Sequence, residues 1–380
     1  MAIYLDYAGG APILEVAREA RVEALKFCGS PSSLHSEGRR ALALLDRARD
    51  IIADVLDVDR RGLVFTSSGT EAINLAFFGL IKKAKRFMVG AADHNAVIAV
   101  ARQLRYLNKY VFYCPVDRQG HLNISVLVKI LQDFGPSDVV SITFVNNEVG
   151  TQENVVELCK VIRAVSPCII HVDMCQGIGF AVKMNALPDA DMISVSGSKV
   201  GAGCGIGVFW AKQDLLLDPI IYGGPQEGGR RAGREPLDGA YSLARALEWW
   251  KSIDSHILEQ LSELETRIRQ YFESSGLRFK WTGDLNARMP GIVSMVVHGI
   301  NGEDMIAYLD MHGICISSGS ACASGSLDPS HVLLAMGFDT VEASSSLRIS
   351  FGPGQNFDEV ERGAKLACDL LCQLQQKFIK

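Results

Sequence analysis

The sequence predicts an α/β fold, with a large domain built on a mostly parallel seven-stranded sheet that carries helices on both faces. From Arg61 onward, short apolar or β-branched segments alternate with segments of helical periodicity, which is the order typical of α/β proteins. The short segments lack strict polar alternation, so both faces should be covered and ligands should bind at the carboxyl ends of the strands. Strands are expected at Leu63–Thr66, Phe87–Val89, Val111–Tyr113, Val139–Phe144, Ile169–Val172, Met192–Val195 and Ile206–Trp210.

A smaller α+β domain is predicted from the C-terminal part of the chain, because 380 residues exceed one small core. We place the large domain at residues 12–255 and the small domain at residues 1–11 and 256–380. Residues 3–7 should cross back to the small domain or edge the site. Further helices and strands are expected near Leu237–Ser275, Ile292–Val297, Glu303–His312, Leu347–Ser350 and Phe357–Phe378.

The composition favours a cytosolic protein that acts on a small molecule. The chain has a net charge of −5 and dispersed basic residues, so it has no basic footprint for nucleic acid. No apolar run approaches the roughly 20 residues of a membrane span, and the first residues lack a signal-peptide pattern. The ten cysteines form no CxxC pair and no Cys/His cluster at zinc spacing, so no metal site is predicted.

An anion-binding helix start is predicted after the first strand of the sheet, in Ser67-Ser-Gly-Thr-Glu71. Ser68 and Glu71 have the spacing of a capping box. Gly69 and Thr70 would direct backbone N–H groups and a hydroxyl out of the helix start, where the dipole favours a phosphate. An ordinary N-cap is the alternative.

Two further strand ends carry side chains suited to a cofactor. Asp173, with Gln176 three residues later, places a carboxylate that can hold a cationic ring nitrogen, as pyridoxal phosphate requires. Lys199 precedes a glycine-rich turn and can form a Schiff base with a carbonyl cofactor, with the hydroxyls of Ser196 and Ser198 available to phosphate oxygens. The alternatives are a helix-capping aspartate and a solvated loop lysine.

Three more polar residues stand at or near the predicted site. His94 lies at a strand-to-helix junction with Asp93 as the expected N-cap, and its imidazole can stack on a planar cofactor and move protons. Asn147 ends another strand and offers an amide to a phenolic oxygen or a carboxylate. Arg348, in a small-domain strand, suits a bidentate pair with a substrate carboxylate. A structural role is the alternative for each.

Cys322 lies in a segment, residues 317–326, in which every other residue is Ser, Gly or Ala. Because nothing beside the sulfur has bulk enough to pack, the segment favours a moving nucleophile on a loop at about residues 317–330 over a buried structural cysteine. A surface linker with an incidental cysteine is the alternative.

Together these segments resemble the cysteine desulfurases, pyridoxal-phosphate enzymes of fold type I, and among them the group that serves iron–sulfur assembly and nitrogenase-type sulfur supply. The resemblance covers nearly the whole chain, and several matches in family order are more specific than any one. The matching motifs are residues 4–7, 65–71, 93–97, 145–150, 171–176 and 317–324.

The resemblance implies a role for each candidate. Lys199 would hold pyridoxal 5′-phosphate through a Schiff base and move the substrate Cα proton. Asp173 would pair with the pyridine nitrogen, Gln176 would contact the ring hydroxyl, and His94 would stack on the ring. The implied phosphate ligands are Gly69, Thr70, Ser196 and Ser198.

The resemblance also implies the reaction. Asn147, beside the cofactor, and Arg348 would bind the carboxylate of L-cysteine, and the thiolate of Cys322 would attack its sulfur. The products would be L-alanine and a persulfide on Cys322, which would pass to an unidentified acceptor protein for iron–sulfur cluster assembly or tRNA thiolation. The enzyme would be a homodimer.

The chain departs from the family at two positions beside the implied phosphate site. Ser198 stands where most of the family has a histidine, and Arg234 stands where a threonine usually reaches the partner subunit's phosphate. We hypothesise that Arg234 donates to that phosphate across the dimer and offsets the missing histidine.

Two alternatives to a cysteine desulfurase remain. A related pyridoxal-phosphate enzyme, such as a selenocysteine lyase or an aminotransferase, would use much of the same site. A degenerate paralogue acting as a binding or regulatory subunit is of another class. Retention of all five chemical groups argues against it: Lys199, Asp173, His94, Cys322 and Arg348.

Overall fold

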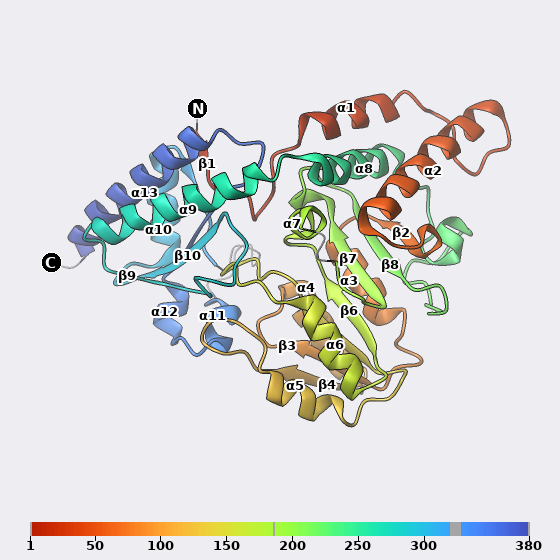
Figure 1. Ribbon diagram of the computed structural model, residues 1–380, viewed down its shortest axis with the longest axis horizontal. Helices are drawn as coiled ribbons and strands as arrows, with labels where there is room; N and C mark the ends of the chain where they lie inside the picture. Colours follow the sequence, from red (N-terminus) through yellow and green to blue (C-terminus); the bar gives the residue numbers. More distant parts are fainter. Residues whose placement is uncertain (1, 185–186, 320–327, 379–380) are drawn as a thin grey trace.

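The structure is a computed structural model that describes residues 2–184, 187–319 and 328–378. Its largest sheet has seven strands in the order β2-β8-β7-β6-β5-β3-β4 (Figure 1), so every strand predicted for the large domain forms. Their bounds are β2 Leu63–Thr66, β3 Arg86–Gly90, β4 Tyr110–Cys114, β5 Val139–Thr143, β6 Ile169–Asp173, β7 Met192–Ser196 and β8 Gly207–Ala211.

The direction of the strands confirms a mostly parallel sheet. β4, β3, β5, β6 and β7 run parallel to one another, whereas β8 runs antiparallel to both of its neighbours, β2 and β7. Two antiparallel pairings in succession give β2 the direction of β7. The carboxyl ends of β2, β3, β5, β6 and β7 therefore lie at the same edge of the sheet.

Helices cover both faces of this sheet, as predicted. Neighbouring residues of a strand enter different cores: Val64 packs with α3 and α4, whereas Phe65 packs with the helices of the opposite face. Burial on both faces explains why the strands read as unbroken apolar runs. The helices of this part are α1 Glu15–Ala24, α2 Ser36–Leu56, α3 Gly69–Phe78, α4 Asn95–Tyr106, α5 Ile124–Leu131, α6 Val155–Val165, α7 Ile178–Lys183 and α8 Leu237–Ser252.

The C-terminal part forms a second, three-stranded antiparallel sheet in the order β12-β10-β9. β9 was not predicted, because its three residues are too few to show a period. The expected helix from Leu237 to Ser275 is two helices, since Ile253 adopts an extended conformation after α8. The remaining elements are α9 His256–Ser274, β9 Phe279–Trp281, β10 Ile292–Val297, α10 Gly302–Met311, β11 Ile314–Cys315, α11 His331–Ala335, α12 Thr340–Ser344, β12 Ser346–Ser350 and α13 Phe357–Phe378.

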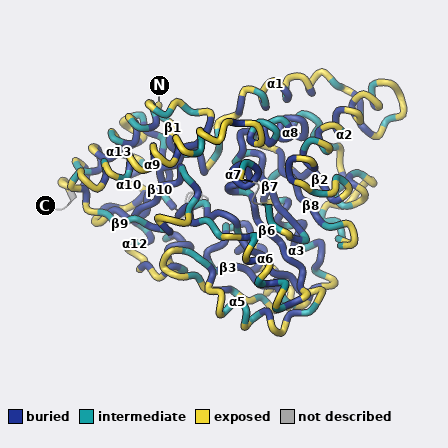
Figure 2. The backbone as a smooth tube through the Cα atoms, viewed as in Figure 1, coloured by how far each residue is buried: buried dark blue, intermediate teal, exposed yellow. Residues whose placement is uncertain are grey.

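The N-terminus crosses to this second part. β1 (Ile3–Tyr4) pairs in parallel with β11, and Asp6 forms a bridge with Ser350 at the end of β12. Buried residues follow the central strands of both sheets, and exposed residues follow the outer faces of α1, α2, α9 and α13 (Figure 2). The edge strands β4 and β9 are partly exposed. None of the described helices is long and apolar enough to cross a membrane.

A buried ion pair and a hydrogen bond attach the glycine-rich segment around Gln226–Gly229 to α2 and β2. The Arg49 Nη2 atom lies 2.7 Å from Oε1 of Glu227, whose side chain is 2% exposed. Oε2 of Glu227 also accepts a 3.0 Å hydrogen bond from the Phe65 N–H. In the same segment, Arg231 contacts Glu71 on α3 at 2.9 Å. The segment is thereby fixed beside the start of α3.

We expect Glu227→Gln to lower the free energy of unfolding by about 3 kcal/mol, because it leaves the Arg49 guanidinium charged and largely buried without its counterion. The measurement is urea denaturation followed by circular dichroism. Glu37→Gln is the matched control, since Glu37 and Arg40 form an exposed pair and its loss should change stability by less than about 0.5 kcal/mol. Equal effects of the two substitutions would contradict a stabilising role for the buried pair.

Candidate active site

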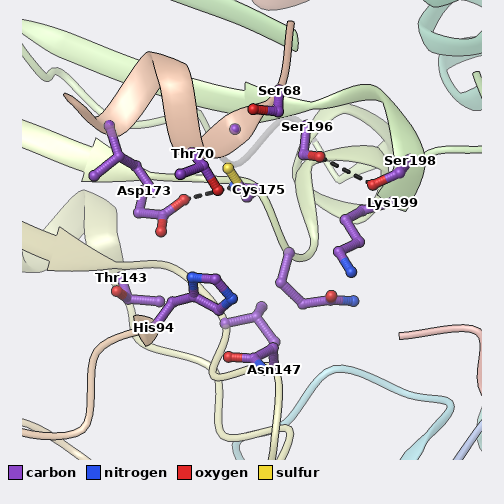
Figure 3. A pocket seen from close by; sticks show the side chains of 14 residues that line it. Ser68, Thr70, His94, Thr143, Asn147, Asp173, Cys175, Ser196, Ser198 and Lys199 are labelled. Carbon is purple, nitrogen blue, oxygen red and sulfur yellow. Dashed lines mark hydrogen bonds between the residues drawn. The ribbon is translucent and has the colours of Figure 1, made fainter. Parts of the chain in front are cut away.

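A cavity of about 210 Å³ opens at the edge of the sheet where the parallel strands end (Figure 3). Its lining comes from the residues that end or follow β2, β3, β5, β6 and β7. The lining residues are Ser68, Gly69, Thr70, Ile73, His94, Thr143, Val145, Asn147, Asp173, Cys175, Gln176, Ser196, Ser198 and Lys199.

Most residues singled out from the sequence meet at this cavity; two of the described ones do not, and one is not described. Arg234 and Arg348 are absent from its lining, and Cys322 lies outside the described residues. Sequence reasoning did not assign Thr143, Val145 or Cys175 to the site, although Thr143 and Cys175 stand at the carboxyl ends of β5 and β6. The predicted residues that line it are Gly69, Thr70, His94, Asn147, Asp173, Gln176, Ser196, Ser198 and Lys199.

The start of α3 is capped, but the predicted capping box is only half formed. The Ser68 hydroxyl accepts a 3.2 Å hydrogen bond from the Glu71 N–H. The Glu71 carboxylate does not return to Ser68, because it accepts a 2.7 Å bond from the Ser67 N–H and pairs with Arg231. The first N–H groups of a helix have no carbonyl partner within it. They remain available to an anion at the cavity.

Two hydroxyls face the same end of the cavity. Ser196 and Ser198 lie 3.1 Å apart between their Oγ atoms, and Figure 3 shows them beside Ser68. A Cβ atom on Gly69 would lie only 2.4 Å from Sγ of Cys175 and 3.1 Å from Cβ of Ser196. Glycine is therefore required for the helix start to approach the ends of β6 and β7, and the approach gathers hydroxyl and backbone donors in one place.

Asp173 and Gln176 lie deeper in the site. The Asp173 side chain is buried, and its Oδ1 accepts a 2.9 Å hydrogen bond from the Cys175 N–H. The Oε1 atom of Gln176 is buried and has no hydrogen-bond partner among the residues that the structure describes. A buried amide oxygen without a donor is unfavourable, so we expect this atom to accept a hydrogen bond from a hydroxyl or N–H group of a ligand.

His94, rather than Asp93, is the N-cap of α4. Its Nδ1 atom accepts a 3.1 Å hydrogen bond from the Ala96 N–H, so the ring hydrogen is on Nε2. The Asp93 carboxylate is occupied elsewhere, by the Gly90 N–H at 2.8 Å and the Thr143 hydroxyl at 2.9 Å. Burial lowers the pKa of His94. The imidazole is thus a neutral ring that donates from Nε2.

The N-terminal segment edges the cavity as well as crossing back to the second sheet. The Lys199 Nζ atom donates to the carbonyls of Ala8 and Gly9 at 2.7 and 2.6 Å. The Ala11 N–H donates to the Ser198 carbonyl at 2.9 Å. These contacts use only backbone atoms of the N-terminal segment, so no side-chain motif indicates them in the sequence.

The two predicted arginines have other partners in this chain. The Arg348 side chain is 2% exposed, and its Nη2 atom lies 2.7 Å from Oδ1 of Asp6. Its Nη1 atom donates to the Asn147 carbonyl at 2.7 Å, directly behind the cavity. Arg234 is exposed and donates to the carbonyls of Cys28 and Gly29, both at 2.9 Å.

Glu148 is a buried acid beside the cavity that sequence reasoning missed. Its Oε2 atom accepts a 2.5 Å hydrogen bond from the Ser330 hydroxyl, and its N–H donates to the side chain of Asn146. Burial raises the pKa of Glu148 to about 7. The neighbouring Asn147 lines the cavity. In this turn, the Asn146 side chain therefore holds the backbone and the Asn147 side chain is available to a ligand.

Glu148 should make stability depend on pH. Its pKa rises on folding from about 4.5 to about 7, so the folded state holds the proton more tightly and stability falls as pH rises through this range. Glu148→Gln mimics the protonated form and still accepts from Ser330. We expect its unfolding free energy, relative to the native chain, to increase by about 2 to 3 kcal/mol between about pH 5 and about pH 8. Urea denaturation at the two pH values measures this, and a difference that stays flat would contradict it.

The residues present fit pyridoxal 5′-phosphate. Backbone N–H groups and hydroxyls at the start of α3 and the end of β7 suit its phosphate, and Asp173 suits its ring nitrogen. The unpaired oxygen of Gln176 suits the ring hydroxyl. Lys199 is an amine at the rim of the same cavity and suits the carbonyl carbon.

Comparison with known proteins agrees with this fit. Residues 3–362 match the aminotransferase class-V family. The chain is 33% identical over 362 residues to the cysteine desulfurase IscS of Dictyoglomus turgidum, covering 92% of this chain and 89% of that protein. Among solved structures, a NifS-like protein from Rickettsia africae superposes with a TM-score of 0.88 at 25% identity, covering 98% of this chain and 100% of the other.

A second solved structure, SspA in complex with cysteine, superposes with a TM-score of 0.78 at 26% identity, covering 93% of this chain and 99% of that chain. The family match spans most of the chain, and the fold, the cavity and the named relatives agree. This chain belongs to the aminotransferase class-V family and, within it, to the cysteine desulfurases.

Proposed function

We propose that the protein is a pyridoxal-phosphate-dependent cysteine desulfurase that removes sulfur from L-cysteine and releases L-alanine. The observation that carries this proposal is the cavity in which an amine, a buried carboxylate and a set of anion-binding donors converge, in a chain of the cysteine desulfurase family. A binding or regulatory paralogue would have no need to keep all of these groups in contact with one cavity.

The cofactor and the side chains around it would have different roles in the reaction. When bound, the cofactor supplies a carbonyl for the substrate amine and a ring that accepts electrons from Cα. Lys199, held by the carbonyls of Ala8 and Gly9, is the nitrogen placed to move the proton at Cα. His94 accepts at Nδ1 and donates at Nε2, so it suits stacking on the ring and donating a hydrogen bond better than removing a proton.

We propose Cys322 as the sulfur acceptor. Its thiolate would form an S–S bond with the substrate sulfur as the C–S bond breaks, and the electron pair of that bond would stay on the substrate Cβ, which then takes a proton. The persulfide would pass to an acceptor protein in iron–sulfur assembly or tRNA thiolation. Support comes from the sequence motif around Cys322 and from the family.

The wider setting is also proposed. We propose a cytosolic homodimer without nucleic-acid or membrane partners, divided into a domain of residues 12–255 and a domain of residues 1–11 and 256–380. Arg234 would contact the cofactor phosphate of the other subunit. Among the described residues, its exposed guanidinium is held by the backbone carbonyls of residues 28 and 29, which supports this assignment.

Turnover of L-cysteine tests the central proposal. The purified protein with pyridoxal phosphate should be yellow and should release L-alanine and, with a reductant, sulfide. Cys322→Ser should lower turnover by about a hundredfold or more while the cofactor absorbance remains. Cys204→Ser is the matched control, because Cys204 is exposed and should leave turnover unchanged. A keto acid as product, or sulfide release that ignores Cys322, would overturn the proposal.

Arg234→Ala should weaken cofactor binding by about tenfold, because it removes one charge-assisted hydrogen bond to the phosphate. Fluorescence titration of the apo-protein with pyridoxal phosphate measures the dissociation constant, and size-exclusion chromatography reports the oligomeric state. Arg245→Ala is the control, since Arg245 pairs with Glu248 on α8. Equal affinities for the two variants would contradict the proposed contact.

A further inference from the structure

The buried arginine of β12 already holds a carboxylate from its own chain. Arg348 is 2% exposed, and its two terminal nitrogens contact Oδ1 of Asp6 and the carbonyl of Asn147, each at 2.7 Å. Its Nε atom is buried and has no hydrogen-bond partner in the described part of the chain. A ligand carboxylate therefore cannot reach the front of this guanidinium unless one of its present partners moves.

Asp6 is the partner that is able to move. Its side chain is 24% exposed, whereas the Asn147 carbonyl is backbone. The other acid whose charge acts on Arg348, Glu148, is buried and bonded to Ser330. Asp6 is thus the one carboxylate near Arg348, among the described residues, that water already reaches.

A tight turn holds Asp6 over the arginine. The Asp6 carbonyl accepts bonds from the N–H groups of Gly9 and Gly10 at 3.0 and 3.2 Å and from the Tyr4 hydroxyl at 3.0 Å. A Cβ atom on Gly9 would lie 2.3 Å from Oδ2 of Asp6. The glycine therefore lets the turn fold back onto the carboxylate, and the same turn offers two carbonyls to Lys199.

We propose that Asp6 is a specificity-determining residue that competes with the substrate's α-carboxylate for Arg348. This inference rests on the proposed function, because it assumes an amino-acid substrate in the adjoining cavity. A ligand carboxylate would displace the Asp6 carboxylate from the Arg348 guanidinium and take its place. Such an exchange gives little net binding energy, since the pair that forms resembles the pair that is lost.

The consequence is selectivity for ligands that bind the protein through a second group besides the carboxylate. A simple carboxylate gains almost nothing from the exchange and stays out. An amino acid that is also held through its amine presents its carboxylate at high effective concentration, so the exchange becomes favourable. Asp6 would in this way admit α-amino acids and exclude the abundant carboxylates that lack an amine.

Asp6→Asn tests this inference, with two thiols as probes. 3-Mercaptopropionate has a carboxylate and no amine, and cysteamine has an amine and no carboxylate. Calorimetric titration of the cofactor-loaded protein should show 3-mercaptopropionate binding about tenfold more tightly to Asp6→Asn than to the native chain. Cysteamine affinity should not change. Asp238→Asn is the matched control, since Asp238 pairs with Arg21 outside the cavity and should alter neither affinity.

Gly9→Ala provides a second variant should Asp6→Asn fail to fold. The new Cβ atom would push the Asp6 carboxylate from Arg348 while the charge stays in the chain, so it should also tighten 3-mercaptopropionate binding. Unchanged or weaker binding of 3-mercaptopropionate in the folded variants would overturn the inference. Asp6 would then serve only to hold Arg348 in position. The proposed function fails separately, if the native protein produces no L-alanine from L-cysteine.

Discussion

The common direction of five strands is the constraint on which the rest of the site depends. β2, β3, β5, β6 and β7 all end at one edge of the sheet, so residues more than one hundred positions apart in the sequence line one cavity. The two parallel pairings between β5, β6 and β7 place Asp173 and Ser196 in adjacent strands. A reversed β6 would carry Asp173 to the opposite edge, away from Lys199.

Burial then decides the charge state of the groups at that edge. Desolvation raises the pKa of both Asp93 and Glu148 to about 7 and lowers the pKa of His171 to about 4. His171 is fully buried between the hydroxyls of Ser141 and Ser194, which supply its hydrogen bonds without a charge. These three buried side chains are thus neutral or readily neutralised near neutral pH.

The sequence was sufficient to predict the regularly alternating strands and helices and the polar residues that follow a strand. All seven strands of the large sheet were predictable from apolar runs, and His94, Asp173 and Lys199 were predictable from their positions after such runs. The cap of α4 was predicted wrongly, because Asp93 is the better capping residue by propensity but its carboxylate is taken by Thr143. Tertiary competition of this kind has no local signal, and the same holds for the Glu71 carboxylate, which Arg231 draws away from Ser68.

Contacts between the two ends of the chain were the least predictable part of the site. Asp6 and Arg348 are separated by 342 positions, and nothing in the local sequence around either residue indicates that they pair. Their pairing follows from β1, which adds to β11 and carries the turn of residues 6–10 across the cavity rim. That turn contacts both cationic residues expected to handle an amino acid: its backbone carbonyls hold Lys199, and its carboxylate holds Arg348. Because one short turn engages both cations, a movement of its backbone would alter the contacts of Arg348 and of Lys199 together.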